Sequence, residues 1–483
     1  MSSDSGSRQP KSKAAFVVVA NRLAVERTCD DSGTQGWRTA PGGLVTALVP
    51  IMQAHDGAWI GWHGAPDETL EPFHVDGIDM IPIALSGDEV RDYYEGMANA
   101  TLWPLYHDSV AFPEYHREWW EAYEKVNRRF AEAAAEVTEE GGTVWVQDYQ
   151  LQLVPRILRE LRPDLKIGFF LHIPFPPGEL FQQLPWRRAI LKGLTGADLV
   201  GFQVPGAASN FLRLVKSRLG LETRRNEFVR PDGSVGRAGA YPISIDAEGF
   251  QELANRPETI ARAEEIRRDL DAEIVILGVD RLDYTKGLRQ RIRAIGELFQ
   301  SGELGHDGAV FLQVATPSRE RVEEYMRLRD DIELLVGRIN GSMGEIGRAP
   351  ITYLHSGYPR SEMAALYRAA DVMVVTPRRD GMNLVAKEYV ACRGNDDGAL
   401  VLSEFAGAAR ELKQAWLVNP YDINDMKLAI MEAIHSSEKE QRRRMRAMRK
   451  QVFGNDINRW AETFLRDLGV ETEFNRADRG SSD

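Results

Sequence analysis

Two short segments of the sequence carry the residue types that a diphosphate site needs. In the first, Arg281 and Lys286 follow an apolar run that is rich in β-branched residues. A guanidinium fork and an ammonium group at the end of a strand can together neutralise a diphosphate. In the second, Gly381 lets the backbone approach a ligand closely, and a helix beginning near Leu384 would offer unpaired amide groups to an anion.

Glu388 extends the second segment by one helical turn. It lies four residues beyond Leu384 on the same helix face, where a carboxylate can accept hydrogen bonds from the two hydroxyls of a ribose. The alternative is that both segments are surface turns whose charges are solvated. We favour a nucleotide site because the charges flank glycine-bearing strand exits in both places.

The composition predicts a two-domain protein of a reducing compartment. The chain has 483 residues, of which 43% are hydrophobic and 27% charged, and this length is too great for one ordinary core. The two cysteines exclude a disulfide scaffold, and the nine histidines show no metal-ligand spacing. No apolar run approaches the ~18 residues of a membrane helix. We therefore expect a soluble, cytoplasmic protein with no structural metal and no membrane contact.

The distribution of charge predicts small anionic substrates and no nucleic acid. The formal net charge is −12, which argues against a nucleic-acid surface. Basic residues nevertheless occur in or beside the expected ligand loops, at Arg281, Lys286, Arg319, Arg378 and Arg379. The basic run at 442–449 contains Met445 and Met448 at helical spacing, so we interpret it as the solvated face of a helix.

The alternation of apolar runs with helical patterns predicts an α/β protein. Continuous runs of Val, Ile and Phe are typical of parallel strands that are covered on both faces. These runs lie at 16–20, 143–146, 167–171, 199–202, 274–279, 310–314, 372–375 and 400–402. Apolar residues three and four apart predict helices between the strands, for example at 288–299 and 409–416.

The order of these elements predicts two doubly wound domains. The segment 241–246 follows a polar, glycine-bearing stretch, and we place the boundary there. The first domain would span 14–243 and the second 244–456.

Both ends of the chain have their own pattern. Trp460, Phe464 and Leu468 recur at four-residue spacing, which predicts a last amphipathic helix at about 457–470. The polar ends, 1–13 and 475–483, predict disordered tails.

Polar or ionisable side chains follow the predicted strands. Ligands of open parallel sheets bind outside the carboxyl ends of the strands. The residues at these positions are Asn21, Arg22, Asp148, His172, Gln203, Arg281, Lys286, Arg319 and Asp380. We therefore expect them to line a cleft between the two halves.

Further candidates are weaker when each is taken alone. Gly42 and Gly43 precede an apolar helix and can bring backbone amides against a phosphate or sugar oxygen. Trp62 and Tyr94 can stack on a sugar, although aromatic residues more often belong to a core. A structural histidine is likewise the alternative for His172, whose loop is fixed by prolines.

Taken together, the motifs resemble those of the trehalose-6-phosphate synthase family. The motifs occur in the order of the family at 20–22, 41–44, 102–104, 147–149, 172–176, 201–203, 281–287 and 379–388. The family consists of retaining glycosyltransferases of the GT-B type. The resemblance therefore implies two Rossmann-like domains that face each other across a cleft, with the last helix packing back on the first domain.

The resemblance also implies roles for individual residues. The catalytic set would be Asp148, His172, Arg281, Lys286 and Asp380. The donor set would be Gly42, Gly43, His172, Arg281, Lys286, Asp380, Gly381, Met382, Asn383, Leu384, Val385 and Glu388. The acceptor set would be Arg22, Trp62, Tyr94, Asp148, Gln203 and Arg319.

The implied reaction moves glucose from a nucleotide-glucose to glucose 6-phosphate with retention of configuration. UDP-glucose is the expected donor, with ADP- and GDP-glucose as alternatives, and no cofactor or metal is required. Following the family, we expect front-face attack; the rival is a covalent intermediate on Asp148 or Asp380. Another acceptor such as glycerol 3-phosphate, or a non-catalytic sugar-phosphate sensor, stays open. The chain is also a candidate homo-oligomer.

Overall fold

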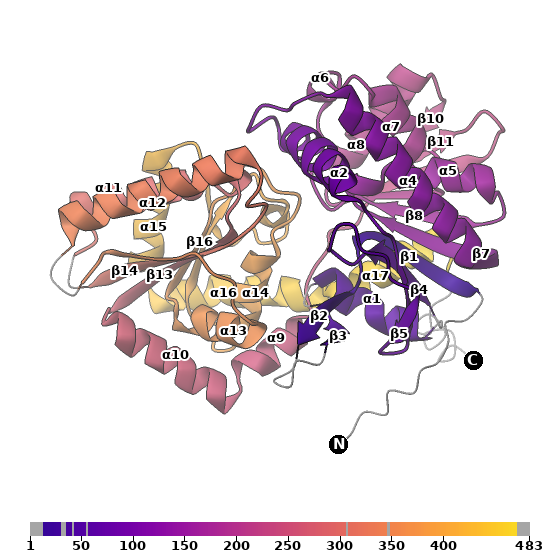
Figure 1. Cartoon of the computed structure of the whole chain (residues 1–483). Helices are drawn as coiled ribbons and strands as arrows, with labels where there is room; N and C mark the ends of the chain where they lie inside the picture. Colours follow the sequence, from indigo (N-terminus) through magenta and orange to yellow (C-terminus); the bar gives the residue numbers. More distant parts are fainter. Residues whose placement is uncertain are drawn as a thin grey trace. The chain divides into compact units, whose positions relative to one another are not determined.

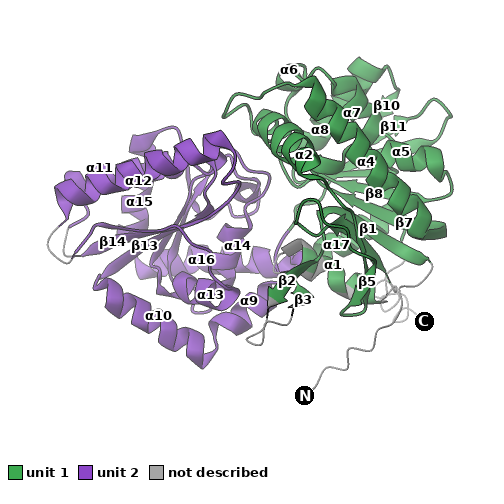
Figure 2. Cartoon of the chain, viewed as in Figure 1, with its two compact units in different colours: residues 1–243, 458–483 green, residues 244–457 purple. Residues whose placement is uncertain are grey.

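The structure divides the chain into two compact units. It is a computed structural model that describes residues 13–29, 35–40, 43–54, 57–305, 308–344 and 348–470 (Figure 1). The expected disordered tails, 1–13 and 475–483, lie outside these residues apart from Lys13. Unit 1 comprises residues 1–243 and 458–483, and unit 2 comprises residues 244–457 (Figure 2).

Unit 1 is built on a sheet whose central strands are parallel. Its order in the described residues is β10 (Thr223–Arg224), β11 (Glu227–Val229), β12 (Val235–Ala240), β9 (Leu199–Phe202), β8 (Lys166–Phe170), β7 (Thr138–Gln147), β1 (Ala14–Arg22), β4 (Ala58–Trp62), β6 (Ile78–Pro82) and β5 (Phe73–Val75). The strands from β12 to β6 in this order run parallel, whereas β11 and β5 join the edges antiparallel. At the centre, Val18 is paired with Trp145 on one side and with Trp59 on the other.

Helices of unit 1 connect these strands. They are α1 (Gly43–Ala54), α2 (Gly87–Glu89), the π-helix η1 (Val90–Leu102), α3 (Trp103–Tyr106), α4 (Arg117–Val137), the 3₁₀ turn η2 (Tyr149–Leu151), α5 (Val154–Leu161), α6 (Gly178–Phe181), α7 (Arg187–Leu194), α8 (Pro205–Leu214), the π-turn η3 (Val215–Leu219) and the final α17 (Ile457–Leu468). A separate hairpin-like sheet pairs β2 (Val25–Cys29) with β3 (Gln35–Thr39).

The predicted last helix is present as α17, and it packs on the sheet of unit 1. The ring of Phe464 stacks on Trp145 with a centroid distance of 4.5 Å. Trp460 lies 5.2 Å from the same indole. Two glycines of the sheet make this approach possible, because a Cβ on Gly168 would lie 2.9 Å from the Phe464 ring and one on Gly201 would lie 2.7 Å from it.

Unit 2 contains a sheet that is wholly parallel in the described residues. Its order is β15 (Ile351–Leu354), β14 (Ala309–Thr316), β13 (Ile274–Arg281), β16 (Val372–Val375), β17 (Ala399–Ser403) and β18 (Trp416–Val418). Its helical elements are α9 (Ala247–Ala254), α10 (Pro257–Leu270), the 3₁₀ turn η4 (Tyr284–Lys286), α11 (Leu288–Gln300), α12 (Glu323–Met343), α13 (Arg360–Ala369), α14 (Leu384–Cys392), the 3₁₀ turn η5 (Gly407–Arg410), α15 (Ile423–His435) and α16 (Glu438–Gly454).

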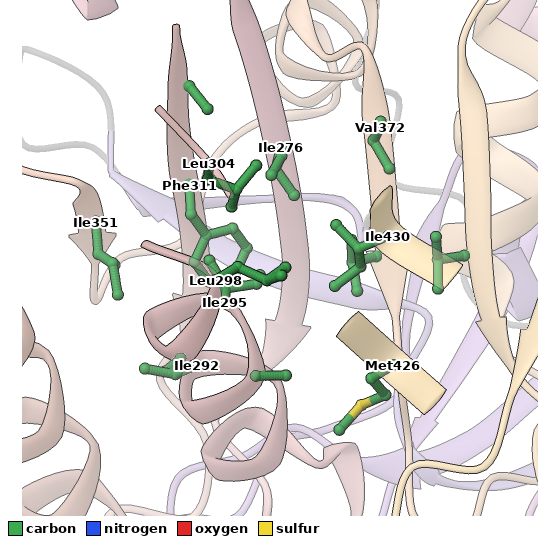
Figure 3. Close-up of a cluster of buried hydrophobic side chains, with 14 of the residues drawn as sticks. Ile276, Ile292, Ile295, Leu298, Leu304, Phe311, Ile351, Val372, Met426 and Ile430 are labelled. Carbon is green, nitrogen blue, oxygen red and sulfur yellow. The ribbon is translucent and has the colours of Figure 1, made fainter. Parts of the chain in front are cut away.

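One face of this sheet is covered by an apolar core that Figure 3 shows. Ile295 and Leu298 of α11 lie against Phe311 of β14, and all three are fully buried. Ile430 of α15 extends the same cluster. Each such side chain stabilises the fold by about 1.5–3 kcal/mol relative to exposure. This core therefore fixes β13 and β14, whose carboxyl ends carry candidate site residues.

The fold class agrees with the expectation from the sequence. Each of the eight predicted apolar runs forms a strand, and the helix predicted at 288–299 is α11. The basic run at 442–449 is a helix face on α16, where Met445 and Met448 are buried and Arg443 pairs with Glu440 at 2.7 Å. None of the helices in the described ranges combines the length and apolarity needed to cross a membrane.

The helix predicted at 409–416 is wrong. That segment forms the 3₁₀ turn η5 and then the strand β18. The amide of Gly407 donates to the Asp380 carbonyl at 3.2 Å, and the amide of Ala408 donates to the Met382 carbonyl at 2.9 Å. Trp416 pairs with Val401 of β17, so the end of the segment is a strand, and the apolar spacing is used by two different elements.

Candidate active site

The loop that follows β13 is shaped by local hydrogen bonds. The Asp283 side chain accepts from the Thr285 amide at 2.9 Å and begins the turn η4. Gly287 ends the turn with a φ of +68°, and a Cβ there would lie 2.1 Å from the Thr376 carbonyl oxygen. Only glycine fits this position. The loop therefore holds Lys286 close to the end of the strand, a few residues after Arg281.

Asp283 is a buried carboxylate that gathers basic side chains. One of its oxygens lies 3.5 Å from Arg319 and 3.9 Å from Arg281. The hydroxyl of Tyr325 donates to the same oxygen at 3.1 Å, and Arg319 also contacts that hydroxyl. Burial alone would raise the pKa of Asp283, but the charges of Arg319, Arg281 and Lys286 lower it to about 2. Asp283 is therefore ionised and positions Arg281 and Arg319 together.

Lys286 makes a tight ion pair with Asp380. Its Nζ lies 2.6 Å from Oδ2 of Asp380, and both side chains are nearly buried, with 12% and 13% exposure. The Asn383 side-chain amide donates to the same oxygen at 3.2 Å. The structure thus brings together two segments that are almost a hundred residues apart in the sequence. From the sequence, both segments are predicted to bind the same ligand.

The loop at 380–383 is strained and leads directly into α14. Asn383 has φ +98° and ψ 93°, a conformation that L residues rarely adopt, and its side chain accepts from the Ala386 amide at 3.1 Å. Of the predicted donor residues, Gly381, Met382 and Asn383 lie in this loop, and Leu384 and Val385 are the first two residues of α14. First-turn amides of a helix have no intrahelical partner, so the start of α14 can bind an anion.

Glu388 lies one turn further along α14. Its Oε2 accepts from the Tyr367 hydroxyl at 2.8 Å. Burial raises the pKa of Glu388. Tyr367 therefore fixes the position of one carboxylate oxygen of Glu388.

A fully buried ion pair supports the turn η4. Arg291 of α11 bonds Asp280 at 2.5 Å and Gln313 at 3.0 Å. It also donates to the Lys286 carbonyl at 3.2 Å. The sequence analysis did not identify Arg291 or Asp283. An arginine among the apolar residues of a predicted helix was the available signal for Arg291, and the Asp-x-Thr turn pattern was the signal for Asp283.

In unit 1, Arg22, Trp62 and Tyr94 form one cluster. The guanidinium of Arg22 lies over the Trp62 ring at 5.0 Å, and the Trp62 and Tyr94 rings meet edge to face at 6.1 Å. Arg22 also donates to the His63 carbonyl at 3.3 Å. Burial lowers the pKa of Arg22, so an anionic ligand would offset the cost of holding this charge.

A second cluster of unit 1 lies at the ends of β7, β8 and β9. Oδ1 of Asp148 accepts from the His172 amide at 3.1 Å, and the Gln203 side chain donates to the His172 carbonyl at 3.3 Å. Asp148 has φ +72° and ψ 174°, which is a region that only glycine adopts easily. Asp148 and Gln203 thus both bond to the backbone of His172. The strained backbone of Asp148 is kept in this conformation by the surrounding structure.

The imidazole of His172 is held in a mainly apolar site. Its Nε2 lies 2.9 Å from Oε1 of Gln147. Phe170 contacts the ring edge to face at 4.7 Å, and Trp460 of α17 lies 6.2 Å away. Burial lowers the pKa of His172 to about 3, so the ring is neutral at neutral pH.

The predicted site residues that remain are Gly42, Gly43 and Arg319. Gly43 is the first residue of α1, and Gly42 lies outside the described residues. Arg319, which was assigned to the acceptor set, lies in unit 2 beside Asp283 and Tyr325. In the described part of the chain, no group of three or more His, Cys, Asp or Glu side chains is placed to hold a metal ion.

Comparison with known proteins adds the family context. The sequence profile of glycosyltransferase family 20 matches residues 14–469. The trehalose-6-phosphate synthase of Mycolicibacterium smegmatis is 54% identical over 482 residues, which are 98% of this chain and 96% of the relative. That of Mycobacterium avium is 55% identical over 463 residues, covering 93% of this chain and 94% of the relative.

Solved structures are similar over almost the whole chain. A UDP-forming α,α-trehalose-phosphate synthase from Burkholderia xenovorans, in complex with glucose 6-phosphate, is 35% identical with a TM-score of 0.86, and covers 94% of this chain and 99% of its own. An Escherichia coli structure bound with UDP-2-fluoro glucose is 34% identical with a TM-score of 0.86, and covers 95% and 99%.

Proposed function

This chain belongs to glycosyltransferase family 20, and we propose on that premise that it is a trehalose-phosphate synthase. In this proposal it transfers glucose from UDP-glucose to glucose 6-phosphate and releases trehalose 6-phosphate and UDP. The single observation that carries the proposal is the grouping of Arg281 and Lys286 with Asp380 and the start of α14 in unit 2. These groups match a diphosphate leaving group.

We assign the donor to unit 2. A nucleoside diphosphate carries several negative charges, so it binds where cations are already in place. Arg281 would grip the diphosphate, Lys286 would add a point charge, and Glu388 would bind the ribose. Asp380 and the backbone from Gly381 to Val385 would hold the glucose, together with His172 of unit 1. The relative bound with UDP-2-fluoro glucose supports a uridine donor.

We assign the acceptor mainly to unit 1. The phosphate of a hexose phosphate carries close to two negative charges at neutral pH, and Arg22 offers a positive guanidinium beside Trp62 and Tyr94. Asp148 and Gln203 lie in the second cluster, where their side chains can bind sugar hydroxyls. The relative in complex with glucose 6-phosphate supports this choice of acceptor.

Catalysis then rests on electrostatic stabilisation of the leaving diphosphate. Preorganised donors of this kind contribute on the order of 3–4 kcal/mol each to the barrier. We propose that the acceptor hydroxyl attacks from the face that the diphosphate leaves and passes its proton to the leaving phosphate. No metal and no cofactor takes part, so activity should persist in EDTA.

Local contacts favour this front-face route over a covalent intermediate. Asp380 is bonded to Lys286 and Asn383, and Asp148 is bonded to the His172 amide. Carboxylates engaged in this way act more readily as binding groups than as nucleophiles. Mass spectrometry of the protein after incubation with a 2-fluoroglucosyl donor tests the point. A mass increase on Asp148 or Asp380 would establish the covalent route instead.

Product analysis tests the proposed function. Purified protein is incubated with UDP-glucose and glucose 6-phosphate, and both UDP release and the sugar product are measured. We expect UDP and an α,α-1,1-linked disaccharide phosphate, with less product from ADP- and GDP-glucose. UDP release only with glycerol 3-phosphate would show that glycerol 3-phosphate is the acceptor. No UDP release with either acceptor would indicate a non-catalytic sensor.

The cysteines fit a reducing compartment. Cys392 is buried and unpaired in the described structure. Two cysteines in 483 residues cannot form a disulfide scaffold. We therefore place this activity in the cytoplasm.

A further inference from the structure

Gln147 is a buried amide whose contact with His172 has no role in the sites assigned so far. It is the last residue of β7 and has 1% exposure. Its Oε1 lies 2.9 Å from Nε2 of His172 at the neighbouring strand end. A carbonyl oxygen only accepts hydrogen bonds, so in this orientation of the amide the contact places the proton on Nε2.

The other half of the Gln147 amide is not satisfied. In the described structure its Nε2 is buried and has no hydrogen-bond partner. A buried unpaired donor costs about 1–3 kcal/mol, so an apolar residue would fill this space more favourably if packing were its only function. The residue is therefore better explained by its oxygen, which faces the imidazole.

The neighbours of the His172 ring decide which of its two nitrogens carries the proton. Phe170 and Trp460 flank the ring, and Gln147 is its hydrogen-bond partner. Asp148 follows Gln147 in the chain, and its Oδ1 accepts from the backbone amide of His172. Because burial lowers the pKa of His172 to about 3, the ring carries a single proton at neutral pH.

We propose that Gln147 is a positioning residue that holds His172 as the neutral Nε2–H tautomer, so that Nδ1 accepts a hydrogen bond from a hydroxyl of the bound sugar. This proposal rests on the proposed function in one respect, namely that His172 contacts a sugar. A glycosyl group gains positive charge as its bond to the leaving group breaks. A neutral acceptor is compatible with that charge, whereas an imidazolium would repel it.

The tautomer can be measured without any substrate. Histidine is labelled with ¹⁵N in the full chain, and the His172 resonances are assigned by comparison with His172→Asn. We expect Nε2 to be protonated and Nδ1 to be unprotonated from pH 6 to pH 8. A proton on Nδ1 would overturn the proposal, because the Gln147 amide would then present its nitrogen to the ring. Charging of the ring within this pH range would also overturn it.

Substitution of Gln147 connects the tautomer to turnover. Gln147→Leu removes the acceptor while keeping an apolar volume, and we expect kcat to fall about 10-fold with little change in the KM for the acceptor. Gln147→Glu places a carboxylate against Nε2–H and favours the imidazolium. We expect the pKa of His172, followed through its ¹⁵N shifts in the substrate-free protein, to rise by at least one unit. An unshifted His172 pKa in Gln147→Glu would contradict the proposal.

Two controls separate positioning from general structure. If Gln147 acts through His172, Gln147→Leu has no further effect on kcat in a His172→Ala background. A purely structural role would give the same loss in both backgrounds and would refute the proposal. Gln150→Glu adds the same charge three residues along, where no hydrogen bond to His172 is present in the described structure. It should leave the pKa of His172 unshifted in the ¹⁵N titration; the same shift would attribute the effect to charge alone and contradict the proposal.

The two proposals fail in different ways. If the Nε2–H tautomer is found but no glucose is transferred to glucose 6-phosphate, the proposed function fails and the positioning by Gln147 stands. If transfer is observed and Nδ1 carries the proton, the proposed function stands and the positioning fails.

Discussion

The strand ends of the two units use different physical means to hold their side chains. In unit 2, ion pairs dominate: Asp283 gathers Arg281 and Arg319, and Asp380 pairs with Lys286. In unit 1, aromatic contacts and backbone hydrogen bonds dominate, as in the stacking of Arg22 on Trp62. Both units are parallel α/β layers, so the fold does not cause this difference. It follows the ligands that we assign, a diphosphate to unit 2 and a hexose phosphate to unit 1.

The largest expected effect is on the stability of unit 2. Asp283→Asn removes the negative charge that faces Arg319, whose side chain has 6% exposure. Removing one partner of a buried ion pair lowers the free energy of unfolding by about 3–5 kcal/mol. Urea denaturation measures the effect. The control is Asp331→Asn, which breaks the exposed pair with Arg289 at 3.4 Å and should cost less than about 1 kcal/mol. An equal decrease in the free energy of unfolding for both variants would show that the ion pair of Asp283 does not stabilise unit 2 more than an exposed pair does.

Lys286→Ala tests the contribution of unit 2 to catalysis. Loss of a preorganised charge at the leaving group should lower kcat by about 10²–10³-fold without unfolding the protein. Steady-state kinetics and circular dichroism measure the two quantities. Lys413→Ala, at an exposed position of the same unit, is the control and should behave like the parent chain. Unchanged turnover would remove Lys286 from the diphosphate site.

Arg22→Ala tests the corresponding cation of unit 1. A hydrogen bond to a charged group is worth about 1.5–3 kcal/mol, so the KM for glucose 6-phosphate should rise about 10–100-fold. Arg27→Ala is a matched control, because Arg27 also lies over an indole ring, that of Trp37 at 5.3 Å, but belongs to no predicted site. A similar rise in KM for both variants would refute the assignment of Arg22 to the acceptor phosphate.

The neutral His172 predicts a smaller effect on the pH dependence of stability. Its pKa is about 3 in the folded state and close to 6.5 in the unfolded chain, so the unfolded chain binds more protons between these values. The free energy of unfolding must then fall as the pH drops below about 6.5. The contribution of His172 is lower by about 2 kcal/mol at pH 5 than at pH 7. His172→Asn should lack this contribution, and an identical pH dependence in both proteins would contradict it.

Much of the fold was predictable because buried parallel strands have continuous apolar sequences. The eight predicted runs include all the strands that carry unit 2 site residues, β13, β14 and β16 among them. Among the strands that were missed, β4 contains Gly61 between Trp59 and Trp62, separated from Trp59 by Ile60, and β18 has only three residues. The error at 409–416 arose because the end of the segment pairs with β17, and such long-range contacts leave no local periodicity.

Site residues were predictable where polar side chains directly follow a strand in the sequence. They were not predictable where their role depends on tertiary contacts. Arg281, Lys286 and Asp380 stand at strand ends in the sequence, whereas Arg22, Trp62 and Tyr94 were grouped only through the family resemblance. The importance of Asp283 depends on its burial beneath basic side chains. The contact of Gln147 with His172 depends on the pairing of β7 with β8.

Equilibrium binding to single variants tests the division between the two units most directly. UDP and glucose 6-phosphate are titrated separately into the parent chain, Lys286→Ala and Arg22→Ala, and the Kd values are measured by calorimetry. We predict that Lys286→Ala weakens UDP binding by at least about 10-fold and leaves glucose 6-phosphate binding within about 2-fold, and that Arg22→Ala does the opposite. A variant that weakens both ligands equally would contradict the account.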